Sequence, residues 1–349
     1  MDAMDGLDGM RLRVQSDVEL REFNTFGVNA RARRFVRIDD ARQIRAVVDH
    51  PELGRLPKLV LGGGSNLLLT RDPAGVVLKI EIPGMRVLHD DAESTVVEAG
   101  AGVAWHDFVC WTLQQGLGGL ENLALIPGSV GAAPVQNIGA YGMELAERFE
   151  SLDLVDLTTG RAATLERAAC RFGYRDSLFK HALAGKSVIT RVRLRLPKPW
   201  RAQLGYAELQ RHLERAGLRE PSPQQVFDAV CAIRRAKLPD PARLGNAGSF
   251  FKNPVVNRTI RNEILDEFPE IVSYPLDDGT YKLAAAWMIE ACGCKGRSLG
   301  GAAVDARHAL VLVNRGGASG DDVLRLAESV RDSVRERFGI ELEYEPVVV

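Results

Sequence analysis

A run of glycine and proline in the middle of the chain constrains the fold most strongly. Residues 126–142 contain four glycines and two prolines within 17 positions, in Ile126-Pro-Gly-Ser-Val-Gly-Ala-Ala-Pro134 and Gln136-Asn-Ile-Gly-Ala-Tyr-Gly142. So many chain breakers argue against a regular helix or strand. Loops of this length are uncommon inside a compact domain unless they have a function. Because its side chains are small, we predict that this run lets a flat ligand lie against the backbone.

A second glycine cluster follows a short apolar strand. The segment Leu59-Val-Leu-Gly-Gly-Gly-Ser-Asn66 could bring backbone N–H groups close to a phosphate. It is not a dinucleotide fingerprint of the G-x-G-x-x-G type, and Leu67-Leu-Leu-Thr70 does not continue as an amphipathic helix. Taken alone, the cluster leaves a tight structural turn as an open alternative.

Strand patterns and helix patterns alternate through the first third of the chain, and further elements of both kinds are expected up to its last helix. The expected strands lie at 34–39, 58–61, 76–80, 95–98 and 309–314, with a strand-rich stretch at 150–196. The expected helices follow Asp40, begin near Trp105, begin at Ser222, lie around 283–291, and run from Ser319 to Gly339. Pro239 and Pro241 end the third of these helices and mark the expected domain boundary.

The charge balance excludes several classes of partner. The 349 residues include 45 basic and 46 acidic side chains, for a formal net charge of -1. This balance offers no general attraction to nucleic acid or to an anionic membrane. The polar N-terminus predicts no signal peptide, and no apolar run approaches the length of a membrane span. We therefore expect a cytoplasmic protein that binds neither nucleic acid nor membrane.

Cysteine and histidine give no sign of a metal site. The five cysteines are widely spaced apart from the pair Cys292 and Cys294, and C-x-C alone is not a zinc or redox signature. None of the six histidines has the spacing of metal ligands. We expect free thiols in a reducing compartment and no metal.

Two further motifs carry candidate chemistry. In Arg171-Phe-Gly-Tyr-Arg-Asp-Ser177, Arg175 could project into a cleft to stabilise an anion, although an exposed charged turn is the alternative. In Gly245-Asn-Ala-Gly-Ser-Phe-Phe-Lys-Asn-Pro254, Ser249 lacks the G-x-S-x-G frame of hydrolases. A nucleophilic role is therefore disfavoured, whereas a role as proton donor stays open.

Six motifs in this order make the chain similar to a known family. They are Asn24-Thr-Phe-Gly27, the Gly-Gly-Gly-Ser-Asn loop, Gly119-Leu-Glu-Asn-Leu-Ala-Leu-Ile-Pro-Gly128, Gln136-Asn-Ile-Gly-Ala-Tyr-Gly142, Phe172-Gly-Tyr-Arg-Asp176 and Gly248-Ser-Phe-Phe-Lys-Asn-Pro254. Together they resemble the UDP-N-acetylenolpyruvoylglucosamine reductase family from about Asn24 to Glu345.

The resemblance implies a fold and an activity. We expect a vanillyl-alcohol-oxidase/PCMH-type FAD-binding fold and a separate C-terminal α+β substrate-binding domain. The implied division is 1–84 and 85–238 for two FAD-binding subdomains, the first joined by the C-terminal tail, and 239–349 for the substrate-binding domain. The implied reaction uses NADPH and non-covalent FAD to reduce the enolpyruvyl group on UDP-N-acetylglucosamine to give UDP-N-acetylmuramate. We expect a monomer.

The resemblance also assigns residues. Arg175 and Glu345 match the pair beside the substrate carboxylate, and Ser249 matches the donor of the final proton. The tail departs from the family pattern, so Glu343 stays open as an alternative to Glu345. The implied substrate-binding residues are Tyr206, Lys237, Asn253, Tyr274 and Lys282, and the implied FAD-binding residues are Gly62, Gly63, Gly64, Ser65, Asn66, Gly128, Ser129, Gly131, Asn137, Gly139 and Ala140.

Two other functions compete with this one. The first is another flavin oxidase of the same fold, and the second is a non-catalytic protein that binds nucleotide sugars. Neither would need Arg175, Ser249 and Glu345 together, because an oxidase forms no enolate and a binding protein needs no proton donor.

Overall fold

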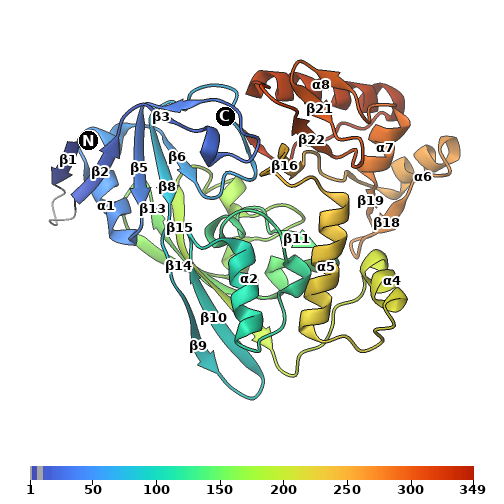
Figure 1. Ribbon diagram of the computed structural model, residues 1–349, viewed down its shortest axis with the longest axis horizontal. Helices are drawn as coiled ribbons and strands as arrows, with labels where there is room; N and C mark the ends of the chain where they lie inside the picture. The colour runs from blue at the N-terminus through green and yellow to red at the C-terminus, as the bar shows by residue number, and fades with distance from the viewer. Residues whose placement is uncertain (1, 6–10) are drawn as a thin grey trace. The chain divides into compact units, whose positions relative to one another are not determined.

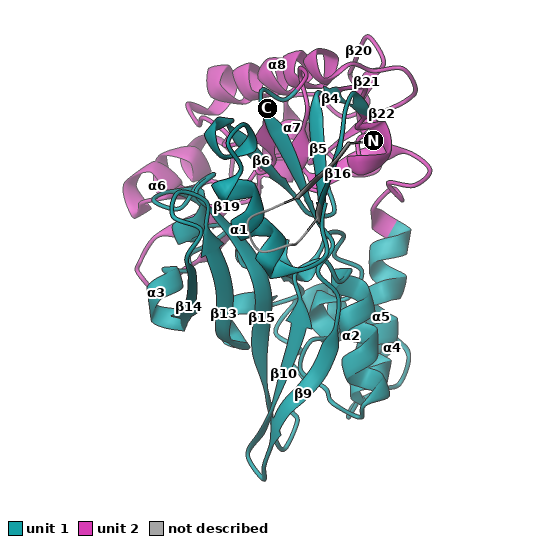
Figure 2. Ribbon diagram, turned by 90° about the vertical axis from the view of Figure 1, so that its left-hand side faces the viewer, with its two compact units in different colours: residues 1–18, 31–64, 73–236 teal, residues 19–30, 65–72, 237–349 magenta. Residues whose placement is uncertain are grey.

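The computed structural model describes residues 2–5 and 11–349, which form two compact units. Unit 1 comprises residues 1–18, 31–64 and 73–236, and unit 2 comprises residues 19–30, 65–72 and 237–349 (Figure 2). Both units combine helices with sheets, which confirms the predicted α+β class.

The first sheet of unit 1 has the strand order β1-β2-β5-β8-β6. Its strands are β1 (Asp2–Asp5), β2 (Arg11–Gln15), β5 (Arg34–Ile38), β6 (Lys58–Leu61) and β8 (Val76–Ile80), and the last three run parallel. Helix α1 (Ala41–Asp49) connects β5 to β6, and a capping box between Asp40 and Gln43 begins it. Ile44 and Val47 are both buried and pack α1 onto this sheet.

The second sheet of unit 1 is antiparallel, with the strand order β14-β13-β15-β10-β9. Its strands are β9 (Met85–Asp90), β10 (Ser94–Gly100), β13 (Phe149–Asp156), β14 (Ala162–Glu166) and β15 (Ser187–Pro197). Helices α2 (Trp105–Gln114), α4 (Ala207–Arg215) and α5 (Pro223–Lys237) share one apolar core with it (Figure 1). The short helix α3 (Arg167–Cys170) follows β14, and β11 (Gly139–Ala140) pairs with β12 (Met143–Glu144).

Unit 2 contains a four-stranded sheet with the order β16-β22-β21-β20. These strands are β16 (Gly245–Ser249), β20 (Ser298–Leu299), β21 (Ala302–Val304) and β22 (Val311–Asn314). A small sheet orders β17 (Val255–Val256), β19 (Tyr281–Leu283) and β18 (Ser273–Pro275). The helices are α6 (Arg258–Glu267), α7 (Ala285–Ala291) and α8 (Gly320–Phe338), and β7 (Leu67–Leu68) runs parallel to β23 (Val347–Val348).

Most predicted elements are confirmed, and the differences have local causes. The capping pair Ser319 and Asp322 begins α8, and Gly339 ends it in the left-handed region at φ 66°. The helix expected at 283–291 begins only at Ala285, because Leu283 still belongs to β19. The strand expected at 309–314 begins at Val311, because a turn bond joins the Val311 N–H to the His308 carbonyl. The three-part division at 84 and 238 stays a prediction.

Candidate functional site

The two glycine-rich loops of the sequence meet within unit 1. A Cβ added to Gly62 would lie 2.6 Å from Ser129 Oγ, and a Cβ added to Gly63 would lie 2.7 Å from Gly128 Cα. Glycine is therefore required here by the close approach of one loop to the other. The glycine cluster is therefore more than a tight turn, because its backbone packs against the backbone of the second glycine-rich loop.

Neighbouring backbone holds the second loop in place. The Trp105 N–H donates to the Gly128 carbonyl over 2.9 Å, and the Gly131 N–H donates to the Ala101 carbonyl over 3.0 Å. On the first loop, Lys79 Nζ donates to the Gly62 carbonyl over 2.6 Å, and burial lowers the pKa of Lys79. The loop pair is thus a supported cradle free of bulky side chains, which fits the diphosphate of a dinucleotide cofactor such as FAD.

The side chain of Asn137 bonds to three neighbouring groups of unit 1. Its Nδ2 donates to Glu144 Oε2 over 2.8 Å and to the Gly173 carbonyl over 3.0 Å, and its Oδ1 accepts from the Ala146 N–H over 2.9 Å. Every polar atom of this side chain is therefore engaged within unit 1. The amide ties the β11–β12 hairpin to the turn that contains Arg175.

Arg175 lies in a constrained turn of unit 1. Its φ is 52°, in the left-handed region, and backbone bonds between Gly173 and Asp176 close the turn around it. Its Nη2 donates to the Gly139 carbonyl, and a Cβ on Gly139 would lie 2.8 Å from Arg175 Nη1. The guanidinium is therefore fixed against the glycine of β11 and is not the solvent-exposed charge of the alternative interpretation.

Two tyrosines lie beside this region of unit 1. Tyr206 precedes α4, is 42% exposed, and its ring meets that of Tyr141 edge-on at 5.2 Å between centroids. Burial raises the pKa of Tyr141 to about 12, so its hydroxyl keeps its proton at neutral pH. The exposed Tyr206 ring thus contacts the half-buried ring of Tyr141.

In unit 2, Ser249 ends β16 at a β-bulge. Its backbone pairs with Val311, the register shifts between Asn246 and Ser249, and Gly248 takes a φ of 69°. The next residue, Phe250, is fully buried. A bulge re-aims a side chain at the end of a strand, and here it leaves Ser249 partly exposed next to a buried aromatic anchor.

The backbone distinguishes the two candidate glutamates of the tail. The Glu345 N–H donates to the Phe250 carbonyl over 2.9 Å, one residue beyond Ser249. Glu343 pairs with Lys252 at 2.8 Å, and its side chain is 74% exposed. Asn66 Nδ2 donates to the Glu345 carbonyl over 3.2 Å. These contacts link the backbone of Glu345 to the end of the first glycine loop, whereas Glu343 forms a surface ion pair.

The remaining predicted substrate residues lie in unit 2. Lys282 is the direct cross-strand neighbour of Tyr274, which is 49% exposed. Asn253 Oδ1 accepts a hydrogen bond of 3.0 Å from the N–H of Ala285, the first residue of α7. Lys237 is the last residue of α5 and is exposed.

The structure therefore gathers the predicted residues into two groups. Unit 1 holds Arg175 and Tyr206 with the paired glycine loops, and unit 2 holds Ser249 and Glu345 with Asn66. Sequence reasoning missed Arg234, whose pKa the nearby Arg175 charge lowers, and Tyr141, which acts on the same guanidinium. The spacing of Arg234 four residues after Val230 could have placed it at the edge of the buried helix face.

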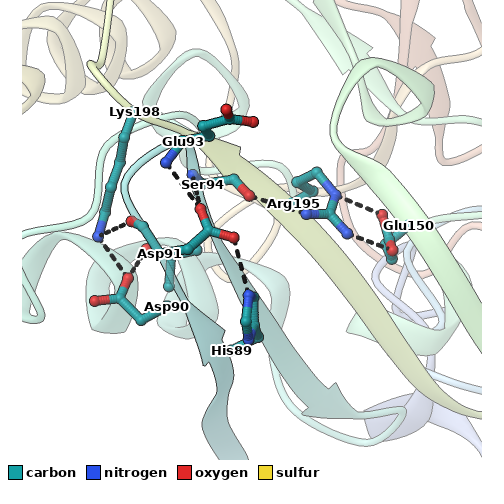
Figure 3. Close-up of polar contacts among 9 residues, drawn as sticks. His89, Asp90, Asp91, Glu93, Ser94, Glu150, Arg195 and Lys198 are labelled. Carbon is teal, nitrogen blue, oxygen red and sulfur yellow. Dashed lines mark hydrogen bonds and ion pairs between the residues drawn. The ribbon is translucent and has the colours of Figure 1, made fainter.

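One open cavity of unit 1 is lined by none of the predicted catalytic residues. It measures about 1300 Å³, is open to solvent, and is lined by charged side chains such as Arg148, Glu150 and Arg195 of unit 1. Arg195 Nη2 lies 2.6 Å from Glu150 Oε1, and its Nη1 donates to Ser94 (Figure 3). The charges of Arg195 and Glu150 therefore neutralise each other within this cavity.

Within residues 2–5 and 11–349, no group of three or more His, Cys, Asp and Glu side chains is placed to hold a metal ion. No helix in the same part of the chain is long and apolar enough to cross a membrane.

Comparison with known proteins adds independent findings. Residues 240–349 match the UDP-N-acetylenolpyruvoylglucosamine reductase C-terminal domain, and residues 32–166 match an FAD binding domain. A UDP-N-acetylenolpyruvoylglucosamine reductase of Burkholderia orbicola is 56% identical over 97% of this chain and 98% of its own. That of Paraburkholderia xenovorans is 56% identical over 94% of this chain and 95% of its own. The crystal structure of UDP-N-acetylenolpyruvylglucosamine reductase from Thermus caldophilus matches with a TM-score of 0.65 and 25% identity, over 97% of this chain and 99% of that one.

Proposed function

Because this chain belongs to the UDP-N-acetylenolpyruvoylglucosamine reductase family, we propose that it reduces UDP-N-acetylglucosamine enolpyruvate to UDP-N-acetylmuramate. The electrons come from NADPH through non-covalently bound FAD, and the product serves peptidoglycan precursor synthesis. The observation that carries this proposal is the match to curated reductases at 56% identity over 97% of the chain.

The paired loops of unit 1 would hold the FAD. Backbone from residues 62–66, 128–129 and 131 would contact its diphosphate. Gly62, Gly63 and Gly128 carry no side chain that would block this approach. Residues 139–140 would lie along the flavin, and Asn137 would support them from behind because its amide is engaged elsewhere. When bound, FAD supplies the hydride acceptor and donor that the side chains of this protein lack.

The substrate chemistry needs a cation and an acid. The enolpyruvyl double bond takes a hydride at its terminal methylene carbon, and negative charge then develops on the adjacent carbon and its carboxylate. Arg175 would stabilise that charge, with Glu345 assisting beside the carboxylate. Ser249 would donate the proton that completes the lactyl group. The two hydrogens added to the double bond are thus one hydride and one proton.

The nucleotide part of the substrate requires separate contacts. Tyr206, Lys237, Asn253, Tyr274 and Lys282 would bind the UDP-sugar. Two of them, Tyr274 and Lys282, are already neighbours across β18 and β19, which suits joint recognition of one diphosphate by a hydroxyl and an ammonium group.

Stopped-flow measurement of both half-reactions in Ser249→Ala tests the assignment. Flavin reduction by NADPH needs no proton from Ser249 and should stay near the wild-type rate. Reoxidation by the enolpyruvyl substrate should slow by roughly 10²–10⁴-fold, as expected for the loss of a positioned acid. Ser298→Ala, at an exposed strand position, is the matched control. Slow flavin reduction with normal reoxidation would show that Ser249 positions the nicotinamide or the flavin instead.

We further propose that the protein acts in the cytoplasm as a monomer, with 1–84 and 85–238 as the two FAD-binding subdomains and 239–349 as the substrate-binding domain. Sedimentation of the holoenzyme at assay concentration tests the oligomeric state.

A further inference from the structure

The first turn of helix α2 supports the backbone that leads into the second glycine-rich loop. Trp105 Nε1 donates to the Leu123 carbonyl over 2.9 Å, and the Trp105 N–H donates to the Gly128 carbonyl over 2.9 Å. The next residue, His106, accepts at Nδ1 a hydrogen bond of 3.1 Å from the Leu125 N–H. Two consecutive residues of α2 thus hold three points of this segment, which ends where the two glycine-rich loops meet.

Leu125 has a backbone conformation that needs support. Its φ is 55°, in the left-handed region, where a residue with a side chain is disfavoured. Such conformations persist only where the surrounding contacts enforce them. Ile126 and Pro127 follow, and the proline ring restricts both of these residues. A change of conformation at Leu125 would therefore pass along a stiff link to Gly128.

The contacts of the His106 ring determine where its proton lies. A backbone N–H can only donate, so Nδ1 accepts from Leu125 without a proton of its own, and the neutral ring carries its hydrogen on Nε2. This Nε2 lies 3.7 Å from Cys110 Sγ, which can accept a weak hydrogen bond. From the neighbouring helix α5, the Phe227 ring stacks on His106 with 5.6 Å between centroids and 4° between planes (Figure 1). The ring is thus oriented so that Nδ1 meets the Leu125 N–H.

Charged groups from two helices act on His106. Burial lowers the pKa of His106, Asp107 on the same helix opposes this effect, and Arg235 and Arg234 on α5 lower the pKa further. Burial raises the pKa of the Cys110 thiol, so its sulfur stays uncharged at neutral pH. The imidazole is therefore neutral at neutral pH. In acid, a proton on Nδ1 would turn this acceptor into a donor and break its bond to the loop.

We propose that His106 is a positioning residue for FAD binding, whose neutral ring holds Leu125 in the left-handed conformation and thereby presents the second glycine-rich loop to the cofactor. This inference rests on the proposed function, in which that loop contacts FAD. Without the bond to His106, the loop of the apoprotein adopts other conformations, and only the fraction in the binding conformation takes up FAD. Because the bond needs the neutral ring, the affinity for FAD falls in acid.

Titration of the apoprotein with FAD, followed by flavin fluorescence between about pH 5 and 8, tests the proposal. His106→Phe keeps a ring that can stack on Phe227 but has no acceptor, whereas His106→Asn supplies an amide oxygen that accepts a hydrogen bond and takes up no proton. At the upper end of this pH range, His106→Phe should bind FAD about tenfold more weakly than wild type, as expected when a backbone donor loses its acceptor. His106→Asn should stay within about threefold of wild type, since it keeps an acceptor. As the pH falls below the ordinary histidine value of about 6.5, wild type should lose affinity and His106→Asn should keep it.

His89→Asn is the matched control, because His89 is an exposed histidine of β9 that pairs with Asp91. Its affinity for FAD should follow that of wild type at every pH. If His106→Phe binds FAD as tightly as wild type in the neutral range, or if His106→Asn loses affinity in acid as wild type does, His106 does not position the loop and the proposal is wrong. Equal weakening by both His106 variants in the neutral range would also overturn it, because the acceptor would then make no difference.

A measurement on the wild-type protein keeps the proposal testable if the variants do not fold. Nuclear magnetic resonance of the imidazole nitrogens gives the pKa of His106 in the apoprotein and in the FAD complex. Since protonation and FAD binding oppose each other, FAD should lower the pKa of His106 by about one pH unit, which corresponds to a tenfold change in affinity. A histidine with only a structural role would have the same pKa in both forms, and that result would overturn the proposal. A protein that binds no FAD at any pH, or that does not oxidise NADPH with the substrate, would instead refute the proposed function.

Discussion

A single methyl group at Gly63 should disrupt the contact between the two glycine loops. The Cβ of alanine would lie 2.7 Å from Gly128 Cα and 3.2 Å from the Gly128 carbonyl carbon. Attractive contact between carbon atoms requires about 3.5–4.0 Å. Because the neighbouring atoms belong to backbone, no side chain can rotate away, and one loop must move by roughly 1 Å.

The expected loss of stability follows from the cost of overpacking. Extra methyl groups in close-packed regions cost about 1–3 kcal/mol, and we expect the upper half of that range because the obstacle is backbone. For a domain of this size, 1 kcal/mol lowers Tm by roughly 2–4 °C. The melting temperature of Gly63→Ala should therefore fall by roughly 4–12 °C, and FAD should bind at least tenfold more weakly because the cradle is displaced.

Gly62 provides a contrast that separates side-chain from backbone obstruction. Its added Cβ would meet Ser129 Oγ at 2.6 Å, but the next atom, Ala132 Cβ, is at an ordinary 3.5 Å. Deleting the hydroxyl should relieve the clash, so Ser129→Ala should restore much of the stability of Gly62→Ala. The same substitution should not rescue Gly63→Ala, whose obstacle is the backbone of Gly128.

Thermal unfolding followed by circular dichroism and FAD titration of the apoprotein measure these effects. Gly205→Ala is the matched control, because a Cβ there would meet nothing within 4 Å. If Gly63→Ala had the same melting temperature and the same FAD affinity as Gly205→Ala, the two loops would not be in the close contact described. The proposed FAD cradle would then be wrong.

Three other perturbations have clear expected outcomes. Glu345→Gln should slow reoxidation by substrate at least tenfold, whereas Glu343→Gln, which only breaks a surface ion pair, should change it less than about twofold; the opposite order in stopped-flow would reassign the carboxylate. Asn137→Ala should lower the free energy of unfolding in urea by about 2–3 kcal/mol, because it removes three hydrogen bonds; an unchanged midpoint would contradict this. Burial raises the pKa of Tyr141 to about 12, so above pH 10 the unfolded state loses this proton first and the stability of the fold falls as the pH rises toward 12. The fall in stability should be shallower in Tyr141→Phe. Parallel profiles of stability against pH for the two proteins would refute the burial of the phenol.

Local sequence determined the ends of elements. Asp40, Ser319 and Gly339 act on backbone within four residues of themselves, so their chemistry is readable without knowledge of the fold. The order of six motifs also determined the family, because each motif preserves a local segment of the site. The roles proposed for Arg175 and Ser249 come from these motifs and stay predictions.

Only the tertiary structure decided how these segments meet. Gly62 and Gly63 are required because residues 128–129 pack against them, and Glu345 is distinguished from Glu343 by its bond to Phe250. Asn137 appears in a ligand-binding motif, yet its amide binds protein. Arg234 and Arg235 are adjacent in the sequence, and only the structure shows that Nε of Arg234 is buried while Arg235 is exposed. Burial and close approach depend on residues far apart along the chain, and a local pattern cannot report them.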